Sequence, residues 1–222
     1  MEPYLGVVAA LARRKDRLDE LATKLAGMKG KLFPIKTDVS KEEDILNAFK
    51  WIKDNLGAVH ILINNAGTTT LEFLTEGDTK AWDNTLRVNV LGMCIATREA
   101  VKDMKANNVD GHIIHMNSIS GHEVVPAPQM NIYPACKYAV TALAETLRKE
   151  MKFLKLRIKI TSISPGLIDT DLVPDFVKNQ ASVEAGTLLE AEQVADSVIY
   201  VLSTPPHVQI QELSIRTLFD LY

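Results

Sequence analysis

The chain has 222 residues, of which 46% are hydrophobic and 24% are charged, a composition that suits a single globular domain spanning residues 1–222. A net charge of −3 and a pI near 6.0 give no electrostatic reason to expect a nucleic-acid or membrane partner. The sequence shows no run as apolar and long as a membrane span and no signal-peptide pattern. Its two cysteines, Cys94 and Cys136, have neither metal nor redox spacing, so we expect a cytoplasmic protein without a metal site.

Apolar runs and helical stripes alternate along the chain. Short apolar runs predict β-strands at residues 7–12, 32–37, 59–63, 111–117, 157–163 and 208–215. Apolar residues at helical spacing predict helices at residues 16–28, 40–57, 79–107, 133–154 and 192–202. Residues 40–43 have the sequence of a capping box, which would begin the second helix. Strands that alternate with long helices indicate right-handed crossovers, and therefore an α/β fold with a doubly wound parallel sheet.

Polar or glycine-containing clusters follow four of the predicted strands. Asp38, Asn65, Ser118 and the pair Pro165-Gly166 each come immediately after a strand or at its end. In open parallel sheets the ligand binds beyond the carboxyl ends of the strands. These clusters therefore predict a single site at one edge of the sheet.

Tyr133 and Lys137 stand four residues apart at the start of a predicted helix, so they share one face of it. A free phenol has a pKa of about 10, and a nearby ammonium group favours the phenolate. Lys137 is therefore expected to lower the pKa of Tyr133, which would then exchange protons near pH 7, with Ser118 bound to the same substrate oxygen. A Tyr-x-x-x-Lys pair alone occurs by chance in many helices, so the surrounding residues decide whether this pair is functional.

The surrounding motifs resemble those of the short-chain dehydrogenase/reductase family over nearly the whole chain. In chain order they are Asn64-Asn65-Ala66-Gly67, Asn89, Ser118, Tyr133-x-x-x-Lys137 and Pro165-Gly166-x-x-x-Thr170. Four further stretches resemble a subgroup with insect farnesol dehydrogenases and vertebrate keto-steroid reductases: Ala12-Arg13-Arg14, Asn117-Ser-Ile-Ser-Gly-His122, Lys137-Tyr-Ala-Val-Thr-Ala-Leu143 and Val201-Leu-Ser-Thr-Pro205. The resemblance implies a Rossmann fold and an NAD(P)-dependent oxidoreductase.

The resemblance also implies catalytic roles for individual residues of this sequence. Tyr133 would be the general acid and base, and Ser118 would position the carbonyl or alcohol oxygen. Lys137 would lower the pKa of Tyr133 and bind the nicotinamide ribose. Asn89 would kink its helix and hold a water of the proton relay.

Cofactor-binding roles follow from the same resemblance. Those that would contact the adenosine half or steady the sheet beneath it are Asp38, Val39, Asn65, Ala66 and Gly67. Those that would contact the nicotinamide half are Tyr133, Lys137, Pro165, Gly166, Ile168 and Thr170.

Arg13 and Arg14 bear on the choice between NADP(H) and NAD(H). A carboxylate after the corresponding strand of the family would bind the ribose 2′-hydroxyl and select NAD. Guanidinium groups instead suit a 2′-phosphate, so we expect NADP(H) to be preferred. The alternative is that Arg13, Arg14, Lys15 and Arg17 only form a solvated basic turn.

One element of the family is missing from the sequence. The Gly-rich turn Thr-Gly-x-x-x-Gly-x-Gly does not occur, and Gly6 is the only glycine before Gly27. The chain is therefore expected to lack the family's first strand, turn and helix, which bring backbone N–H groups to the pyrophosphate. Residues 7–12 would either keep their own place in the sheet or slide into the central one, which would move Arg13 and Arg14 toward the pyrophosphate.

The predicted function is hydride transfer between NADP(H) and a lipophilic alcohol or ketone, such as farnesol or a steroid-like molecule. A catalytically inactive binding protein is the alternative, because the glycine turn is absent. A sugar or polyol substrate is a weaker alternative, since the two loops near the site carry the apolar residues Val124, Val125, Met130, Leu172, Val173, Phe176 and Val177. The resemblance implies a homodimer or homotetramer formed through the helices at 79–107 and 133–154.

Overall fold

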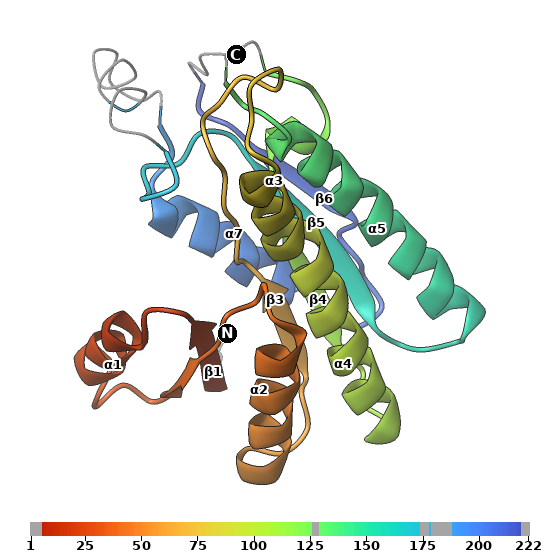
Figure 1. Cartoon of the computed structure of the whole chain (residues 1–222). Coiled ribbons are helices and arrows are strands. Elements are labelled where there is room, and N and C mark those ends of the chain that lie inside the picture. The colour runs from red at the N-terminus through yellow and green to blue at the C-terminus, as the bar shows by residue number, and fades with distance from the viewer. Residues whose placement is uncertain (1–5, 126–128, 174–177, 179–187, 219–222) are drawn as a thin grey trace.

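The computed structural model describes residues 6–125, 129–173, 178 and 188–218. These residues form two β-sheets of parallel strands, flanked by helices (Figure 1). One sheet contains β1 (Val7–Ala12) and β2 (Lys31–Lys36), and the other has the order β3-β4-β5-β6. The second sheet consists of β3 (Ile61–Asn64), β4 (His112–Met116), β5 (Lys159–Pro165) and β6 (Glu212–Ile215). Every neighbouring pair of strands is parallel, which confirms the predicted α/β class.

Helices connect consecutive strands, as the alternating pattern predicts. They are α1 (Lys15–Lys24), α2 (Glu42–Asn55), α3 (Thr79–Leu86), α4 (Gly92–Ala106), α5 (Tyr133–Phe153) and α7 (Ala191–Leu202). A π-helical turn (Arg87–Leu91) joins α3 to α4, and a short 3₁₀ turn (Ile119–Gly121) follows β4. The single long helix predicted at residues 79–107 is therefore continuous but bulged, and the bulge includes Asn89.

The core consists of two apolar layers, one on each face of the four-stranded sheet. Side chains alternate between the two faces of a strand. Accordingly, Ile113 of β4 packs with Met104 of α4 and Ala144 of α5, whereas its neighbour Ile114 packs with Val201 of α7. Figure 1 shows α4 and α5 on one side of the sheet and α7 on the other. The four-stranded sheet is thus covered on both faces, as parallel sheets require.

The capping box predicted at residues 40–43 is wrong. Helix α2 begins at Glu42 after Lys41, and no side chain caps it. The Ser40 hydroxyl and backbone N–H instead donate to Asp38 Oδ1, at 2.7 and 3.0 Å. A neighbouring carboxylate therefore satisfies the serine that the sequence pattern assigned to the helix.

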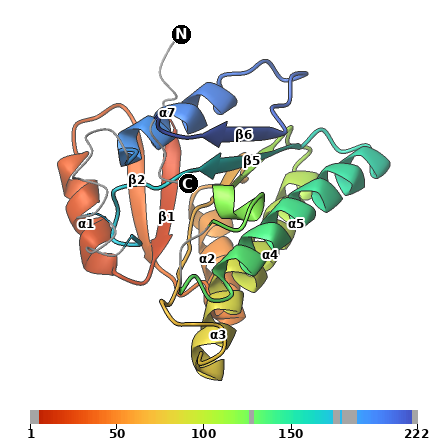
Figure 2. The same cartoon turned by 90° about the horizontal axis from the view of Figure 1, so that it is seen from above.

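The sheet is interrupted between β1 and β3. Among the described residues β1 pairs only with β2, and β3 pairs only with β4. Figures 1 and 2 show β1 and β2 apart from the four-stranded sheet. This break is where the sequence lacks the family's first strand. Strand β1 keeps its own place, because it pairs with β2 over its whole length, from Val7 opposite Lys31 to Ala12 opposite Lys36.

The unit formed by residues 7–36 has almost no core of its own. Neither strand of this unit nor α1 contains a buried residue, and Leu21, Leu25 and Met28 are exposed. A tilted ring contact between Phe33 and Trp51, with centroids 6.0 Å apart, ties β2 to α2. Since a lone two-stranded sheet is marginally stable in water, this unit depends on a few contacts with the rest of the chain.

We expect residues 7–36 to open independently of the rest. In hydrogen–deuterium exchange followed by mass spectrometry, peptides from 7–36 should exchange at least about tenfold faster than peptides from β4, β5 and α5, a difference of at least about 1.4 kcal/mol in opening free energy. Equal protection in both parts would contradict this expectation and would support the prediction of one cooperative domain.

Candidate active site

The predicted clusters all lie at the carboxyl ends of strands. Arg13 and Arg14 follow β1, and Asp38 and Val39 follow β2 after Thr37. In the four-stranded sheet, the residues that end or follow the strands are Asn65, Ala66 and Gly67 after β3, Ser118 after β4, and Pro165, Gly166, Ile168 and Thr170 at β5. The interruption of the sheet divides them into two groups, a basic group that follows β1 and β2 and a second group at the four-stranded sheet.

Tyr133 begins helix α5, as predicted from Pro134, which occupies the first turn. Its side chain is buried, with 9% of the residue exposed. The Ser118 side chain lies close enough to the phenol to lower its pKa, and Ser118 Oγ accepts the N–H of Ser120 at 3.1 Å. The structure therefore brings the predicted serine and tyrosine close together.

Lys137 lies one turn further along α5 and is also buried. Its Nζ is 5.6 Å from the centroid of the Tyr133 ring, within the range of a cation–π contact. The ammonium group donates a hydrogen bond to the backbone carbonyl of Met116, at 2.9 Å. Lys137 and Tyr133 thus lie close together in the buried region at the end of β4.

The predicted direction of the Tyr133 pKa shift is wrong in this structure. Burial raises the pKa of Tyr133 to about 12, and the hydrogen bond from Ser118 offsets only part of that rise. Burial also lowers the pKa of Lys137 to about 8. Removal from water is thus the largest cause of each shift. At neutral pH Tyr133 is a neutral phenol that can donate a proton, and Lys137 remains mostly charged.

Asn89 holds the loop that follows β3. Its Oδ1 accepts the N–H of Thr68 at 2.8 Å, and its Nδ2 donates to the carbonyl of Thr68 at 2.7 Å. The π-helical turn at Asn89 confirms the expected distortion of the helix. Close packing continues at Gly92, where a Cβ atom would collide with the backbone carbonyl of Val39.

The basic group meets an acidic partner that the sequence analysis did not identify. Arg14 and Arg17 form ion pairs with Asp171, at 3.4 and 2.8 Å, and all three side chains are exposed. Ser40 and, more weakly, Arg13 lower the pKa of Asp38. Exposed ion pairs contribute at most about 1 kcal/mol each, so Asp171 leaves the guanidinium groups available to a stronger anion. Its position past Pro165-Gly166, at the same sheet edge, was the available signal.

The predicted apolar loop residues have different environments. Val125 is buried, whereas Val124 and Leu172 are 71% and 39% exposed. Phe176 and Val177 lie outside the described residues. The exposed members are available for contact with an apolar ligand.

Two buried histidines, His112 and His115, belong to β4 beneath the site. His112 Nε2 is 2.9 Å from Thr161 Oγ1, and His115 Nδ1 is 3.1 Å from Asn64 Nδ2. Burial lowers the pKa of each to about 4; Lys159 adds to the effect on His112, and Arg148 and Lys137 add to that on His115. Both imidazoles are therefore neutral at physiological pH.

The chemistry of this donor set fits one end of a nicotinamide dinucleotide. A buried phenol, a hydroxyl and an ammonium group converge at the carboxyl edge of β4, where a ligand binds in such folds. The pyrophosphate end does not fit as well, because no strand lies between β1 and β3 among the described residues and the sequence has no Gly-rich turn.

Comparison with known proteins identifies the class. The short chain dehydrogenase family model matches residues 5–181, and the chain therefore belongs to the short-chain dehydrogenase/reductase family, whose members are oxidoreductases that use nicotinamide dinucleotides. The chain is 44% identical over 218 residues to the farnesol dehydrogenase of Aedes aegypti, covering 95% of this chain and 85% of that protein. It is 45% identical over 217 residues to dehydrogenase/reductase SDR family member 11 of Homo sapiens, covering 94% and 84%.

Solved structures confirm the Rossmann-like fold. An alcohol dehydrogenase from Thermococcus sibiricus complexed with 5-hydroxy-NADP superposes with a TM-score of 0.83 at 24% identity, over 96% of this chain and 87% of that one. The closed form of a serine dehydrogenase complexed with NADP⁺ gives a TM-score of 0.84 at 27% identity, over 98% and 87%. The interrupted sheet thus retains the arrangement of the family over most of its length.

We expect the buried histidines to make the fold sensitive to acid. Their folded pKa of about 4 lies below the unfolded value of 6.5, so the unfolded chain binds more protons as the pH falls from 6.5 to 4. Acid therefore favours unfolding in that window, by about 2 kcal/mol or more per histidine at full extent. Urea unfolding at pH 7 and pH 4.5 measures the loss.

Two variants distinguish the contribution of the buried histidines to this loss of stability from that of the carboxylate groups. His112→Gln with His115→Gln should reduce the loss of stability between the two pH values, whatever its effect at pH 7. His60→Gln, a change at an exposed histidine, should leave the loss as in the parent protein. An equal loss in all three proteins would contradict the assignment.

Proposed function

We propose that the protein is an NADP(H)-dependent oxidoreductase that interconverts a lipophilic alcohol and its carbonyl compound, of the terpenoid or steroid-like class. The observation that carries the proposal is the buried contact of Tyr133 with Ser118, beside the ammonium group of Lys137. The similarity to a farnesol dehydrogenase and the exposed apolar side chains of Val124 and Leu172 support the substrate class.

The bound nicotinamide would supply or accept the hydride. Ser118 would hold the substrate oxygen by a hydrogen bond. Tyr133, a neutral phenol, would donate its proton to that oxygen as negative charge develops on it. Lys137 would stabilise the phenolate left behind, because an adjacent cation favours the anionic form. Because an alkoxide is a stronger base than a phenolate, a phenol with a pKa of about 12 can still protonate it.

Arg13 and Arg14 support the preference for NADP(H). Guanidinium groups recognise phosphate through charge-assisted, often bidentate hydrogen bonds, and both residues follow β1 at the carboxyl edge of its sheet. The proposal assigns residues to the 2′-phosphate and nicotinamide ends only. The alternative of an inactive binding protein rests on the missing glycine turn, and the similarity to dehydrogenases over about 95% of the chain favours the enzyme.

The proposal includes a homodimer or homotetramer in the cytosol. A hollow of about 330 Å³ lies between α4 and the second half of α5, remote from Tyr133. Phe153 and Leu154 beside it are 86% and 49% exposed, which suits burial against a second copy. No helix in the described part of the chain has the length and apolar character to cross a membrane.

We expect Tyr133→Phe to lower kcat about 10³-fold, because general acid catalysis contributes about 10²–10⁴-fold. Circular dichroism and cofactor affinity should stay close to those of the parent protein. Tyr200→Phe, which changes an exposed tyrosine on α7, is the matched control and should keep full activity. Turnover retained in Tyr133→Phe would refute the role of the phenol.

Fluorescence titration tests the cofactor. NADPH should bind with micromolar affinity, and NADH at least tenfold more weakly. Arg13→Ala with Arg14→Ala should weaken NADPH binding about 10–100-fold, the effect of losing hydrogen bonds between charged groups, and leave NADH binding unchanged. Arg157→Ala, a change in an exposed ion pair with Asp110, is the control. No binding of either cofactor up to millimolar concentration would support the inactive binding protein.

A further inference from the structure

The side chains of Ser162, Ser164 and Glu212 lie side by side on one face of the sheet. Ser162 and Ser164 are two residues apart on β5, so they point to the same face. Glu212 of β6 stands opposite Ser162 in the strand register. Further along the same face of β5, Ile160 packs in the core beneath α4 and α5. Interior strands of parallel sheets are normally apolar on both faces, so this polar group departs from the rule.

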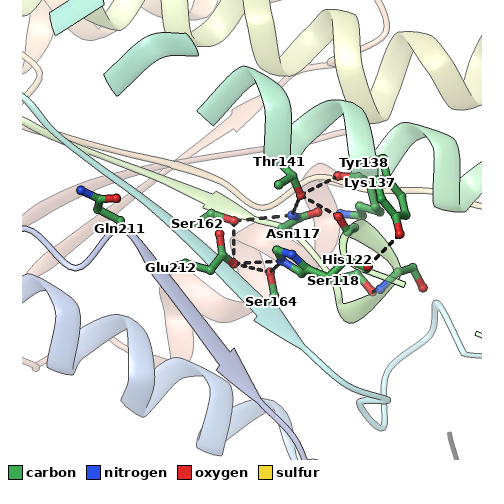
Figure 3. A network of polar contacts seen from close by, with 12 residues as sticks. Asn117, Ser118, His122, Lys137, Tyr138, Thr141, Ser162, Ser164, Gln211 and Glu212 are labelled. Carbon is green, nitrogen blue, oxygen red and sulfur yellow. Dashed lines mark hydrogen bonds and ion pairs between the residues drawn. The ribbon is translucent and has the colours of Figure 1, made fainter. Parts of the chain in front are cut away.

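Glu212 gathers three donors on one carboxylate oxygen (Figure 3). Ser164 Oγ and Ser162 Oγ donate to Glu212 Oε1 at 2.6 and 3.1 Å, and His122 Nε2 lies 3.2 Å from it. His122 Nε2 is also 2.9 Å from Ser164 Oγ. Because Ser164 already gives its only hydroxyl hydrogen to Glu212, the proton between His122 and Ser164 must be on Nε2. Glu212 thereby fixes the tautomer and the orientation of His122.

A second branch of the network runs from Ser162 to Asn117. Asn117 begins the turn at residues 117–122, and His122 ends it. Asn117 Nδ2 donates to Thr141 Oγ1 at 2.8 Å and is 3.5 Å from Ser162 Oγ. Thr141 Oγ1 in turn donates to the carbonyl of Gly121 at 2.9 Å. A Cβ atom at Gly121 would lie only 2.7 Å from Asn117 Nδ2, so the turn packs closely against this amide group. The two branches start at Glu212 and meet across residues 117–122.

Ser118 lies between the two branches. Asn117 precedes it, and His122 follows it after one short helical turn. The hydroxyl of Tyr138 also donates to the carbonyl of His122, at 2.7 Å, and Tyr138 belongs to α5, the helix that carries Tyr133. The network therefore links both ends of the Ser118 turn to the helix of the proposed acid.

We propose that Glu212 is a positioning residue, which holds the 117–122 turn so that the Ser118 hydroxyl meets Tyr133. Its catalytic consequence rests on the function proposed above, whereas its effect on the turn does not. A role in stability alone would not require the carboxylate to be tied to the Ser118 turn, whereas His122 and Ser162 connect Glu212 to both ends of that turn.

The test compares Glu212→Leu with Gln211→Leu. Gln211 is the adjacent residue; its backbone carbonyl accepts from Ser162 N–H and Arg148, and its side chain lies apart from the network in Figure 3. NMR hydrogen exchange follows the amides of Gly121 and His122, which are bonded inside the turn. In Glu212→Leu these amides should exchange at least tenfold faster, while those of Ile113 and Ile160 keep their protection. Gln211→Leu should change neither set.

A second readout follows the contact with Tyr133. The Cζ resonance of ¹³C-labelled Tyr133 should shift in Glu212→Leu toward its position in Ser118→Ala, and Glu212→Gln, which keeps an acceptor oxygen, should restore it. In turnover assays Glu212→Leu should lower kcat about tenfold at unchanged cofactor affinity. In the Ser118→Ala background it should lower kcat no further, because Glu212 acts through Ser118.

The outcomes separate the two proposals. Uniformly faster exchange in β4, β5 and the turn, an unmoved Tyr133 resonance, or additive losses of kcat would overturn the positioning role. A chain that binds no NADPH and turns over no substrate, yet shows the local change in the turn and at Tyr133, would overturn the proposed function and leave the positioning of Ser118 established.

Discussion

The site depends on the burial of a phenol beside an ammonium group. Water stabilises both the phenolate and the ammonium, so removing it raises the pKa of Tyr133 and lowers that of Lys137. The shift of Lys137 from 10.5 to about 8 corresponds to about 3 kcal/mol of unfavourable burial at neutral pH. The carbonyl of Met116 accepts a hydrogen bond from the ammonium and offsets part of that cost. Burial of the pair therefore costs some stability.

The interrupted sheet places this pair in the better-packed part of the molecule. Both apolar clusters consist of residues from the four-stranded sheet and the helices that cover it, whereas the unit at residues 7–36 buries no side chain. Its links to the rest include the ring contact with Trp51 and the exposed ion pairs with Asp171. Such contacts are individually weak. The basic residues at the end of β1 therefore lie in a less tightly packed part of the chain than Tyr133 and Ser118.

The sequence was sufficient for features that depend on neighbours along the chain. Alternating apolar runs predicted the strands, and Pro134 predicted where α5 begins. The capping box failed because Asp38 competes for Ser40, which composition alone does not reveal. The direction of the Tyr133 pKa shift depends on depth of burial, and the role of Glu212 depends on its register with a strand about 50 residues away. Neither the depth of burial nor the strand register can be read from a local sequence pattern.

These contrasts imply that the proposed catalytic residues and the proposed phosphate ligands are held by separate parts of the chain. Tyr133, Ser118 and the network around Glu212 come from β4, β5, β6 and α5, none of which touches the break in the sheet, since β3 lies between the break and β4. The proposed phosphate ligands stand on the other side of that break. We therefore expect the missing segment to weaken cofactor binding without displacing Tyr133, because the packing that orients Tyr133 does not pass through the break in the sheet.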